Sequence, residues 1–436
     1  MIKKCSLIFD IGKTNQKFFL FDEKYNLLKN GKTSIPKVKD EDGFQAENID
    51  KIIEWIKNYL NSLIHLEKYS INTVNFSAFG ATIVNLDKNG KITTPVYDYN
   101  KPIEKDLIND FYKKYGSKKK FSGETGSINL NMLNSGKQLY WLKYTKPEVY
   151  NKIKHSLHLP QYLSYVFTNK MFTDYTSIGC HTDLWNFKTK QYHKWVRNEK
   201  INSLFPPIVK TNKTLNINYK GKKISFGIGI HDSSSALLKY LIKDKNKFIL
   251  LSTGTWCINF NPFSNDQLFN KKDIQSGVTL YMKIDGGFVK TSRLYLGKEH
   301  EEKVKKLEDY YKSPKSLYKN LVFNKIIYKK VNKSNTHFNW VHLDKSNSPN
   351  QDILNFSSFE IAYYQLVFEL ICLLMEKIKI ISIPIPKKIY LDGGFSDNDV
   401  FINILKKQFP KHQVISKPNS YASALGAAMV CSINNN

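Results

Sequence analysis

The feature that most constrains the fold is a strand–turn–strand unit that occurs twice, each time with a polar glycine turn. The first runs from Ser6 to Glu23, where SLIFDI and KFFLFDE flank the turn letters GKTNQ. The second runs from Lys247 to Phe263 and reads KFILLSTGTWCINFNPF. Short apolar runs separated by turn formers are typical of β-hairpins, and glycine permits a sharp reversal of the chain. The sequence therefore predicts two hairpins about half a chain apart.

Each hairpin is followed, much later, by a strand that ends in glycine and leads into a helix. The segments are ISFGIGIHDSSSALLKYLI (224–242) and KKIYLDGGFSDNDVFINILKKQF (387–409), and both keep apolar residues at roughly helical spacing after the glycines. Any α/β protein contains such units, but four in a symmetrical order indicate a duplicated plan. We expect two similar α/β domains, residues 1–242 and 243–436, joined near Ile242–Lys247. A ligand cleft is expected between them.

The first turn has two interpretations. It is either an ordinary β-hairpin turn, or a phosphate-binding hairpin in which Asp10 holds a hydrated magnesium ion. In the second case Thr14, Asn15, Lys17 and the loop N–H groups would face phosphate oxygens. The triplet GKT also occurs in nucleotide-binding P-loops, but that motif needs a second glycine where this chain has Leu7.

The charge of the chain is strongly positive, at +28 over 436 residues. Arg197 and Arg293 are its two arginines, and lysine is spread along the whole chain. Arginine is the usual bidentate reader of guanine and phosphate, so a compositional bias towards lysine explains the charge better than a nucleic-acid surface. A basic field would still attract anionic small molecules such as nucleoside triphosphates.

Other features favour a globular cytoplasmic protein. The longest apolar stretch, Ile361–Ile380, is interrupted by Gln365, Glu369 and Glu376, and therefore predicts a buried helix rather than a membrane span. The N-terminus has no cleavage-type signal. The five cysteines are scattered without a CxxC pair, which disfavours a disulfide or metal framework and favours a reducing compartment.

Two further segments have simpler interpretations. Thr145–Lys170 is expected to be helical, with Pro147 near a helix start, as part of an insertion in the first domain. Lys298–Lys333 begins with a densely charged stretch and is expected to form exposed helix and loop without an assigned function.

Taken together, these motifs resemble those of the FGGY carbohydrate kinases, which belong to the actin and hexokinase superfamily. FDIGKTNQK resembles the first phosphate motif, LSTGTW the second and LDGGFSDND the adenosine motif; SYASALGAAMV resembles the C-terminal connecting helix. GIHDSSSA resembles the segment with the catalytic aspartate. The resemblance covers nearly the whole chain and implies two ribonuclease-H-like, actin-like ATPase domains with an inter-domain cleft.

Within the family, the chain resembles in particular the deoxy-ketose kinases of the rhamnulose kinase branch. HDSSSA, SGKQLYWLKYTKPEVY and FTDYTSIGCHTDLWNF carry this likeness. The segment Ser77–Asp87 keeps only part of the sugar-contact pattern. The resemblance implies a kinase that transfers the γ-phosphoryl group of MgATP to a ketose, such as L-rhamnulose or L-fuculose. Xylulose, ribulose and glycerol are the alternative acceptors.

The resemblance also implies roles for individual residues. Asp232 would be the general base, although the residues alone allow it to be only a helix N-cap; a helix N-terminus favours an ionised carboxylate. His231 would hydrogen-bond the sugar, and Gly80 would let the backbone approach it. The remaining expected contacts are Asp10 for magnesium; Lys13, Thr14, Asn15, Lys17, Thr253, Gly254 and Thr255 for the ATP phosphates; Gly393 and Gly394 for the adenosine; and Asn398 for the base.

Two other classes of protein remain as alternatives. An actin-like or chaperone-like ATPase would act by conformational change without a sugar, but no separate β-rich region follows the repeated pattern. A basic nucleic-acid-binding protein would show weak, salt-sensitive binding. We expect sugar and MgATP as partners, neither nucleic acid nor membrane, and a possible homodimer.

Overall fold

The computed structural model describes residues 3–264, 271–331, 333, 337–340, 356–416 and 421–433. The first hairpin belongs to a sheet with the strand order β14–β15–β6–β1–β2–β3, in which β16 pairs with β6. β1 is antiparallel to β2 and parallel to β6. The strands are β1 (Lys3–Ile11), β2 (Gln16–Asp22), β3 (Leu27–Thr33), β6 (Tyr69–Ala78), β14 (Thr214–Tyr219), β15 (Lys222–Gly227) and β16 (Ile230–His231).

The second hairpin begins a sheet of the same plan, with the order β19–β20–β18–β17–β21–β22. In both sheets three antiparallel strands are followed by two parallel ones, β3–β2–β1–β6–β15 in the first and β20–β18–β17–β21–β22 in the second. The predicted duplication into two ribonuclease-H-like α/β lobes is confirmed. The strands are β17 (Phe248–Thr253), β18 (Cys257–Asn261), β19 (Thr279–Met282), β20 (Phe288–Leu294), β21 (Lys388–Gly393) and β22 (Gln413–Ser416).

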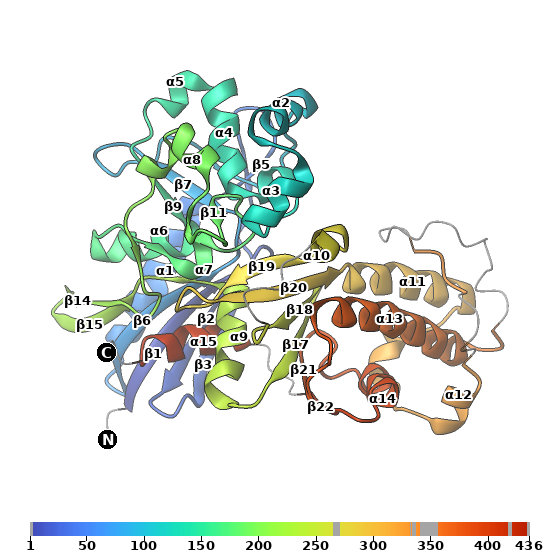
Figure 1. Cartoon of the computed structure of the whole chain (residues 1–436). Helices are drawn as coiled ribbons and strands as arrows, with labels where there is room; N and C mark the ends of the chain where they lie inside the picture. The colour runs from blue at the N-terminus through green and yellow to red at the C-terminus, as the bar shows by residue number, and fades with distance from the viewer. Residues whose placement is uncertain are drawn as a thin grey trace.

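Amphipathic helices cover the sheets. In the first lobe, α1 begins at the N-cap Asn48, whose side chain accepts a hydrogen bond from the backbone N–H of Lys51, and it buries Ile52, Ile56 and Leu60. In the second lobe, α11 and the long buried α13 lie side by side (Figure 1). The helices are α1 (Ile49–Ile64), α2 (Lys105–Tyr115), α3 (Lys118–Thr125), α4 (Ser135–Thr145), α5 (Pro147–Tyr150), α6 (Leu159–Thr168), α7 (Tyr175–Ile178), α8 (Lys194–Asn198), α9 (Asp232–Lys243), α10 (Lys271–Gln275), α11 (Leu296–Tyr311), α12 (Lys325–Lys329), α13 (Phe359–Ile381), α14 (Asp399–Gln408) and α15 (Ala422–Val430).

An insertion between β6 and β14 forms the upper part of the first lobe in Figure 1. It has its own aromatic core, centred on Phe111 and Trp195. Short strand pairs complete it and the region before it: β4 (Val38–Lys39), β5 (Gln45–Glu47) and β8 (Val96–Tyr97); β7 (Ile83–Leu86) and β9 (His155–His158); β10 (Thr173–Asp174) and β13 (Ile208–Val209); β11 (Trp185–Asn186) and β12 (Gln191–Tyr192).

The prediction of helix throughout Thr145–Lys170 is wrong in its middle. The structure has α5, then the strand β9, then α6. β9 pairs with β7, a partner about 70 residues earlier, which local spacing could not indicate. Pro160 lies in the first turn of α6, where its missing N–H costs nothing, so it starts a new helix after the strand.

Helix α9 lies between the two lobes. Leu238 packs with Ile8 and Phe21 from the first sheet, while Leu237 and Tyr240 pack in a cluster with Phe248 and Leu250 from the second. The C-terminal helix α15 lies along α9 and against β1, so the end of the chain returns to the first lobe (Figure 1). The division at residues 242 and 243 therefore stays a proposal.

Two other expectations concern burial and cysteines. The segment from Ile361 to Ile380 lies within α13, as predicted. Among the described residues, none of the helices combines the length and the apolar character needed to cross a bilayer. All five cysteines are free thiols.

Gly426 in α15 is expected to be intolerant of alanine. A Cβ atom there would lie 1.8 Å from the carbonyl oxygen of Ser235 in α9. We expect Gly426→Ala to lower the free energy of unfolding by about 1–3 kcal/mol, because the helices would have to separate. Urea denaturation followed by circular dichroism measures this.

Gly123→Ala in α3 is the matched control. Its nearest neighbour would be the far end of the flexible Ile274 side chain, at 2.8 Å, with the next atom at 4.0 Å. We expect Gly123→Ala to be neutral or slightly stabilising because alanine favours the helix. Equal stability of the two variants would show that the α9–α15 contact is not rigid.

Candidate active site

Two cavities meet at the hairpin of the second lobe. The inter-lobe cavity has a volume of about 610 Å³ and is lined from both lobes, by Lys13, Gly80, His231 and Asp232 on one side and by residues that include Thr253, Gly254, Trp256 and Arg293 on the other. The second, called here the α11 cavity, has a volume of about 900 Å³ and lies within the second lobe. Gly254 lines both cavities, so a ligand in one can reach a ligand in the other at this turn.

Asp232 is the first residue of α9, and its carboxylate lines the inter-lobe cavity. The N-cap position belongs to His231, so Asp232 is not the N-cap that the sequence allowed. Its Oδ1 accepts hydrogen bonds from the backbone and hydroxyl groups of Ser233. Desolvation nevertheless raises the pKa of Asp232 to about 6. Burial thus outweighs the helix terminus, which was expected to favour the ionised form.

Asp10 lies near the end of β1 and is 9% exposed. Burial and, secondly, the negative charge of Asp232 raise the pKa of Asp10 to about 6. Its Oδ2 accepts a hydrogen bond of 2.9 Å from the hydroxyl of Ser423, just inside α15. The two carboxylates repel one another when both are ionised. A bound cation would stabilise their ionised forms.

His231 is buried and has protein partners on both ring nitrogens. Nε2 lies 3.1 Å from the Cys180 thiol and 3.3 Å from Asp232 Oδ1, and Nδ1 lies 3.1 Å from the Ser234 hydroxyl. Burial lowers the pKa of His231 to about 3, so the ring is neutral at pH 7. The expected hydrogen bond to a sugar would have to compete with these contacts.

Gly80 also belongs to this cluster. A Cβ atom at this position would lie 3.0 Å from Cys180 Sγ and 3.1 Å from His231 Nε2. The close packing of these two side chains is thus a sufficient reason for glycine at position 80, independent of any ligand.

The sequence assigned Lys13 to the ATP phosphates; in the structure Lys13 lines the inter-lobe cavity and its ammonium is paired with two carboxylates. Lys13 Nζ lies 2.8 Å from Glu47 and 2.9 Å from Asp98, above the ring of Tyr99. Lys37 bonds to the same two carboxylates. Two lysines and two carboxylates form a neutral cluster, which holds the Lys13 ammonium on the inter-lobe side. The partners come from a distant small sheet, so spacing could not reveal them.

The rest of the first turn lies outside the lining of both cavities. The backbone N–H of Gly12 donates to the carbonyl of Asn15 and closes the turn. Within the part of the chain that the structure describes, the side chains of Thr14, Asn15 and Lys17 form no hydrogen bond. Lys17 is the cross-strand partner of Asp10, and its positive charge acts to lower the pKa of that carboxyl.

In the second hairpin, the Thr253 side chain links β17 to the turn after β21, which the sequence did not indicate. Its hydroxyl donates to the carbonyl of Asp392 at 2.6 Å and accepts from the N–H of Phe395 at 3.0 Å. The hydroxyl is bonded on both sides, so its proton is already donated, and the expected phosphate contact of Thr253 stays a prediction. Gly254 and Thr255 are exposed at the turn and line the α11 cavity.

The two glycines of the adenosine-type motif differ from one another. Gly393 has a φ of +87°, and a Cβ atom there would lie 1.9 Å from the carbonyl oxygen of Thr253. The neighbouring strand alone therefore requires glycine at position 393, and the expected adenosine contact stays a prediction. Gly394 lines the α11 cavity, and the nearest atom to its Cβ position is 3.9 Å away.

Asn398 lies at the α11 cavity, but both atoms of its amide are bonded. Oδ1 caps α14 by accepting from the N–H of Phe401, and Nδ2 donates to the hydroxyl of Tyr363 at 2.7 Å. The expected contact to a nucleotide base therefore conflicts with two structural hydrogen bonds.

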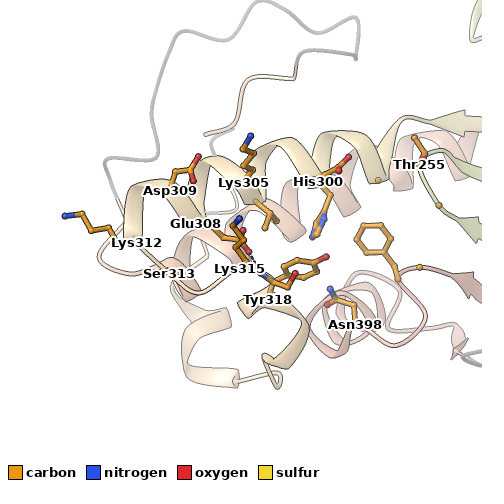
Figure 2. Close-up of a pocket in the computed structure, with 17 residues that line it drawn as sticks. Thr255, His300, Lys305, Glu308, Asp309, Lys312, Ser313, Lys315, Tyr318 and Asn398 are labelled. Carbon is orange, nitrogen blue, oxygen red and sulfur yellow. Dashed lines mark hydrogen bonds between the residues drawn. The ribbon is translucent and has the colours of Figure 1, made fainter. Parts of the chain in front are cut away.

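The α11 cavity also includes residues to which sequence reasoning gave no function. Figure 2 shows His300, Lys305 and Glu308 of α11, together with Tyr318, around the same space as Thr255 and Asn398. The sequence did contain a sign that this segment is packed. Leu296, His300, Val304 and Leu307 recur at helical spacing, which indicates a helix with one buried face. The part of this segment from His300 to Tyr318 is therefore only partly exposed and forms a wall of the cavity.

Comparison with known proteins identifies the architecture. Residues 5–238 match the N-terminal domain of the FGGY family of carbohydrate kinases, and residues 245–436 match an FGGY C-terminal domain. The chain belongs to the FGGY family of carbohydrate kinases. As an FGGY protein it is also similar in structure to a carbohydrate kinase from Novosphingobium aromaticivorans, with a TM-score of 0.80, 20% identity and coverage of 98% of this chain and 93% of that chain.

Several relatives carry narrower names. A rhamnulokinase from Oceanobacillus iheyensis is 24% identical over 59% of this chain and 56% of that protein. A xylulose kinase from Staphylococcus epidermidis is 22% identical over 49% and 42%. A Plasmodium falciparum glycerol kinase structure with ADP has a TM-score of 0.76 at 17% identity, covering 98% of this chain and 89% of that chain. The chain aligns with about half the length of this rhamnulokinase and of this xylulose kinase.

The partly buried Asp232 carboxylate, whose side chain is 31% exposed, is expected to make stability depend on pH. Its folded pKa of about 6 lies above the unfolded value of roughly 4, so the folded state binds more protons between these values. The contribution of Asp232 to stability therefore falls as pH rises from about 4 to 6. We expect Asp232→Asn to gain roughly 1 kcal/mol relative to the native protein at pH 7, after allowance for partial solvent screening, and nothing at pH 4.

Asp244→Asn is the control, because it should change the free energy of unfolding in the opposite direction. Urea denaturation from pH 4 to 8 measures both variants. Hydrogen bonds from Lys388 and Tyr390 lower the pKa of Asp244, so its stabilisation is present above the unfolded pKa and is lost in acid. Asp244→Asn should therefore destabilise the protein at pH 7. A pH-independent effect of Asp232→Asn would contradict the burial argument.

The adjacent glycines provide a second matched pair. Gly393→Ala should destabilise the fold because of the positive φ and the clash with Thr253. Gly394→Ala should leave the free energy of unfolding within about 0.5 kcal/mol, because the protein leaves room for the methyl group. If a nucleotide occupies the α11 cavity, Gly394→Ala should weaken ADP binding at least tenfold in titration calorimetry. Unchanged ADP affinity would place the nucleotide elsewhere.

Proposed function

We propose that this FGGY protein is an ATP-dependent sugar kinase that transfers the γ-phosphoryl group of MgATP to a hydroxyl group of a ketose. The observation that carries the proposal is the pair of cavities that meet at Gly254. One is large enough for a nucleotide and has an exposed glycine turn at its mouth. The other contains a half-buried carboxylate with a raised pKa, as is common at catalytic sites.

Asp232 is the proposed general base. The acceptor hydroxyl oxygen attacks the γ-phosphorus, and the bond from this phosphorus to the bridging oxygen of ADP breaks. The hydroxyl proton passes to the Asp232 carboxylate, and ADP leaves. A base with a pKa near 6 is ionised at pH 7 yet still close enough to neutrality to be an effective proton acceptor. Ser233 holds one carboxylate oxygen, so the second can face the hydroxyl.

Asp10 is the proposed magnesium residue, with Asp232 across the same space. No group of three or more His, Cys, Asp or Glu that could hold a metal occurs among the described residues. This fits magnesium, which is commonly held by one or two carboxylates, water and substrate phosphates rather than by a complete protein cage. When bound, the ion would neutralise phosphate charge. Ser423 keeps the Asp10 side chain oriented, and Thr14, Asn15 and Lys17 are the proposed phosphate contacts of the first turn.

The proposed acceptor is a ketose, with a deoxy-ketose such as L-rhamnulose or L-fuculose favoured. The support is the likeness to rhamnulokinases, which is also present in a protein from Halalkalibacterium halodurans at 26% identity over 43% of this chain. Xylulose is the second candidate, since xylulose kinases have similar identities. The neutral rings of His181 and His231 and the Lys13–Asp98 cluster give the inter-lobe cavity polar groups that suit hydroxyl recognition.

The decisive experiment measures ADP formation with a panel of ketoses, polyols and aldoses, using the native protein and Asp232→Asn. We expect turnover on a ketose and a fall in kcat of roughly 10²–10⁴-fold in the variant, because the proton acceptor is lost. Native turnover should decline below about pH 6, where Asp232 becomes protonated.

Asp244→Asn serves as the activity control, since Asp244 bonds to Lys388 and Tyr390 away from both cavities. Full turnover in Asp232→Asn would remove Asp232 from the mechanism. ATP hydrolysis that no sugar stimulates would favour the actin-like ATPase alternative instead.

A further inference from the structure

Arg293 is an unusual cation in this chain. Of the 66 lysines and arginines, two are arginines. Arg197 is on α8, where it donates to the backbone carbonyl of Tyr192. Arg293 is on β20, is half-buried, and lines the inter-lobe cavity. The arginine of the second lobe thus faces the space that Asp232 faces from the first.

The two cationic side chains that line this cavity, Lys13 and Arg293, differ in their partners. Lys13 is neutralised by Glu47 and Asp98. Arg293, within the described part of the chain, has no carboxylate partner and no hydrogen bond; its guanidinium lies over the ring of Trp256, 5.7 Å from the centroid. Burial acts to lower the pKa of Arg293. A partly desolvated cation without a counter-ion is costly unless a ligand supplies the negative charge.

Arg293 lies on the wall of the inter-lobe cavity that the second sheet forms. Ile258 is its partner across the β18–β20 pair and is itself the partner of Ser252. All three line the inter-lobe cavity, so this face of the second sheet is one of its walls. Trp256, beneath the guanidinium, belongs to the same hairpin as Gly254, where the two cavities meet.

We propose that Arg293 binds an oxyanion in the inter-lobe cavity, either the phosphoryl group in transfer or a carboxylate carried by the acceptor. This inference rests on the proposed kinase function and adds to it a residue that determines rate or acceptor class. Arginine suits the task because its planar fork donates two parallel hydrogen bonds to a phosphate or carboxylate, which the lysine ammonium cannot do. In a chain that otherwise uses lysine, that difference gives a reason for arginine here.

The test compares native protein, Arg293→Lys, Arg293→Met and the control Arg197→Met. Arg293→Met keeps a long apolar stem against Trp256 but loses the charge, and Arg293→Lys keeps the charge but loses the fork. Each variant is assayed with the best neutral ketose and with a sugar acid of the same carbon number, with kcat and KM determined separately. The free energy of unfolding of each variant is measured in parallel.

The two sources of the oxyanion predict different results. If Arg293 binds the phosphoryl group, Arg293→Met lowers kcat for every acceptor at least 30-fold, leaves the KM of the neutral ketose within twofold, and Arg293→Lys recovers only part of the loss. If it binds an acceptor carboxylate, Arg293→Met raises the KM of the sugar acid at least tenfold and leaves the ketose unaffected. Native kinetics in Arg293→Met with both acceptors would overturn the inference, as would losses matched by a fall in folding stability.

A separate measurement keeps this inference distinguishable from the proposed function. Binding of inorganic phosphate and of the sugar acid is measured by calorimetry without nucleotide, in native protein and Arg293→Met. If the native protein phosphorylates no acceptor, the kinase proposal fails, and weaker anion binding in Arg293→Met still supports the role of Arg293. Equal anion binding in the two proteins would overturn it.

Discussion

The contact between α9 and α15 is the constraint on which the site depends. At Gly426 the two helices approach so closely that a single methyl group would overlap the Ser235 carbonyl. The Ser235 hydroxyl donates to the Ser423 carbonyl at 2.6 Å, and the Ser423 hydroxyl donates to Asp10. One short run of α15 therefore fixes both α9, which begins with Asp232, and the carboxylate at the end of β1. The C-terminal helix thus positions two carboxylates of the first lobe, although it follows the whole second lobe in the sequence.

This arrangement brings a buried carboxylate, Asp10, close enough to the half-buried Asp232 for their charges to interact, which is unfavourable. Both have pKa values raised to about 6, mainly by desolvation. A structure selected for stability alone would expose or neutralise them, as it does for Glu47 and Asp98 with Lys13 and Lys37. Lys13 of the neutralised cluster and Asp232 of the repelling pair both line the inter-lobe cavity, and a carboxylate left without a cation is the more typical of a functional site.

The sequence was sufficient for the repeated architecture because its signals are local. Alternating and apolar runs, turn glycines and helical spacing predicted both hairpins, the strand–helix units and the buried α13. The contacts of individual side chains were less predictable, since their partners are distant in sequence. Lys13 bonds to Asp98, Thr253 to Asp392, and Asn398 to Tyr363. The strand β9 was missed for the same reason, because its pairing with β7 is a tertiary contact.

The duplicated lobes share a strand plan but use their hairpins differently. In the first hairpin the polar side chains of Thr14, Asn15 and Lys17 project from a turn that a backbone bond closes, beside a carboxylate. In the second, the hydroxyl of Thr253 is committed to the β21 turn, and what remains accessible is the backbone around Gly254. The N–H of Gly254 itself donates to the Trp256 carbonyl, so the second turn is closed by a backbone bond as the first is. The duplication supplied two similar frames, and the side-chain partners of the two turns are what distinguishes them.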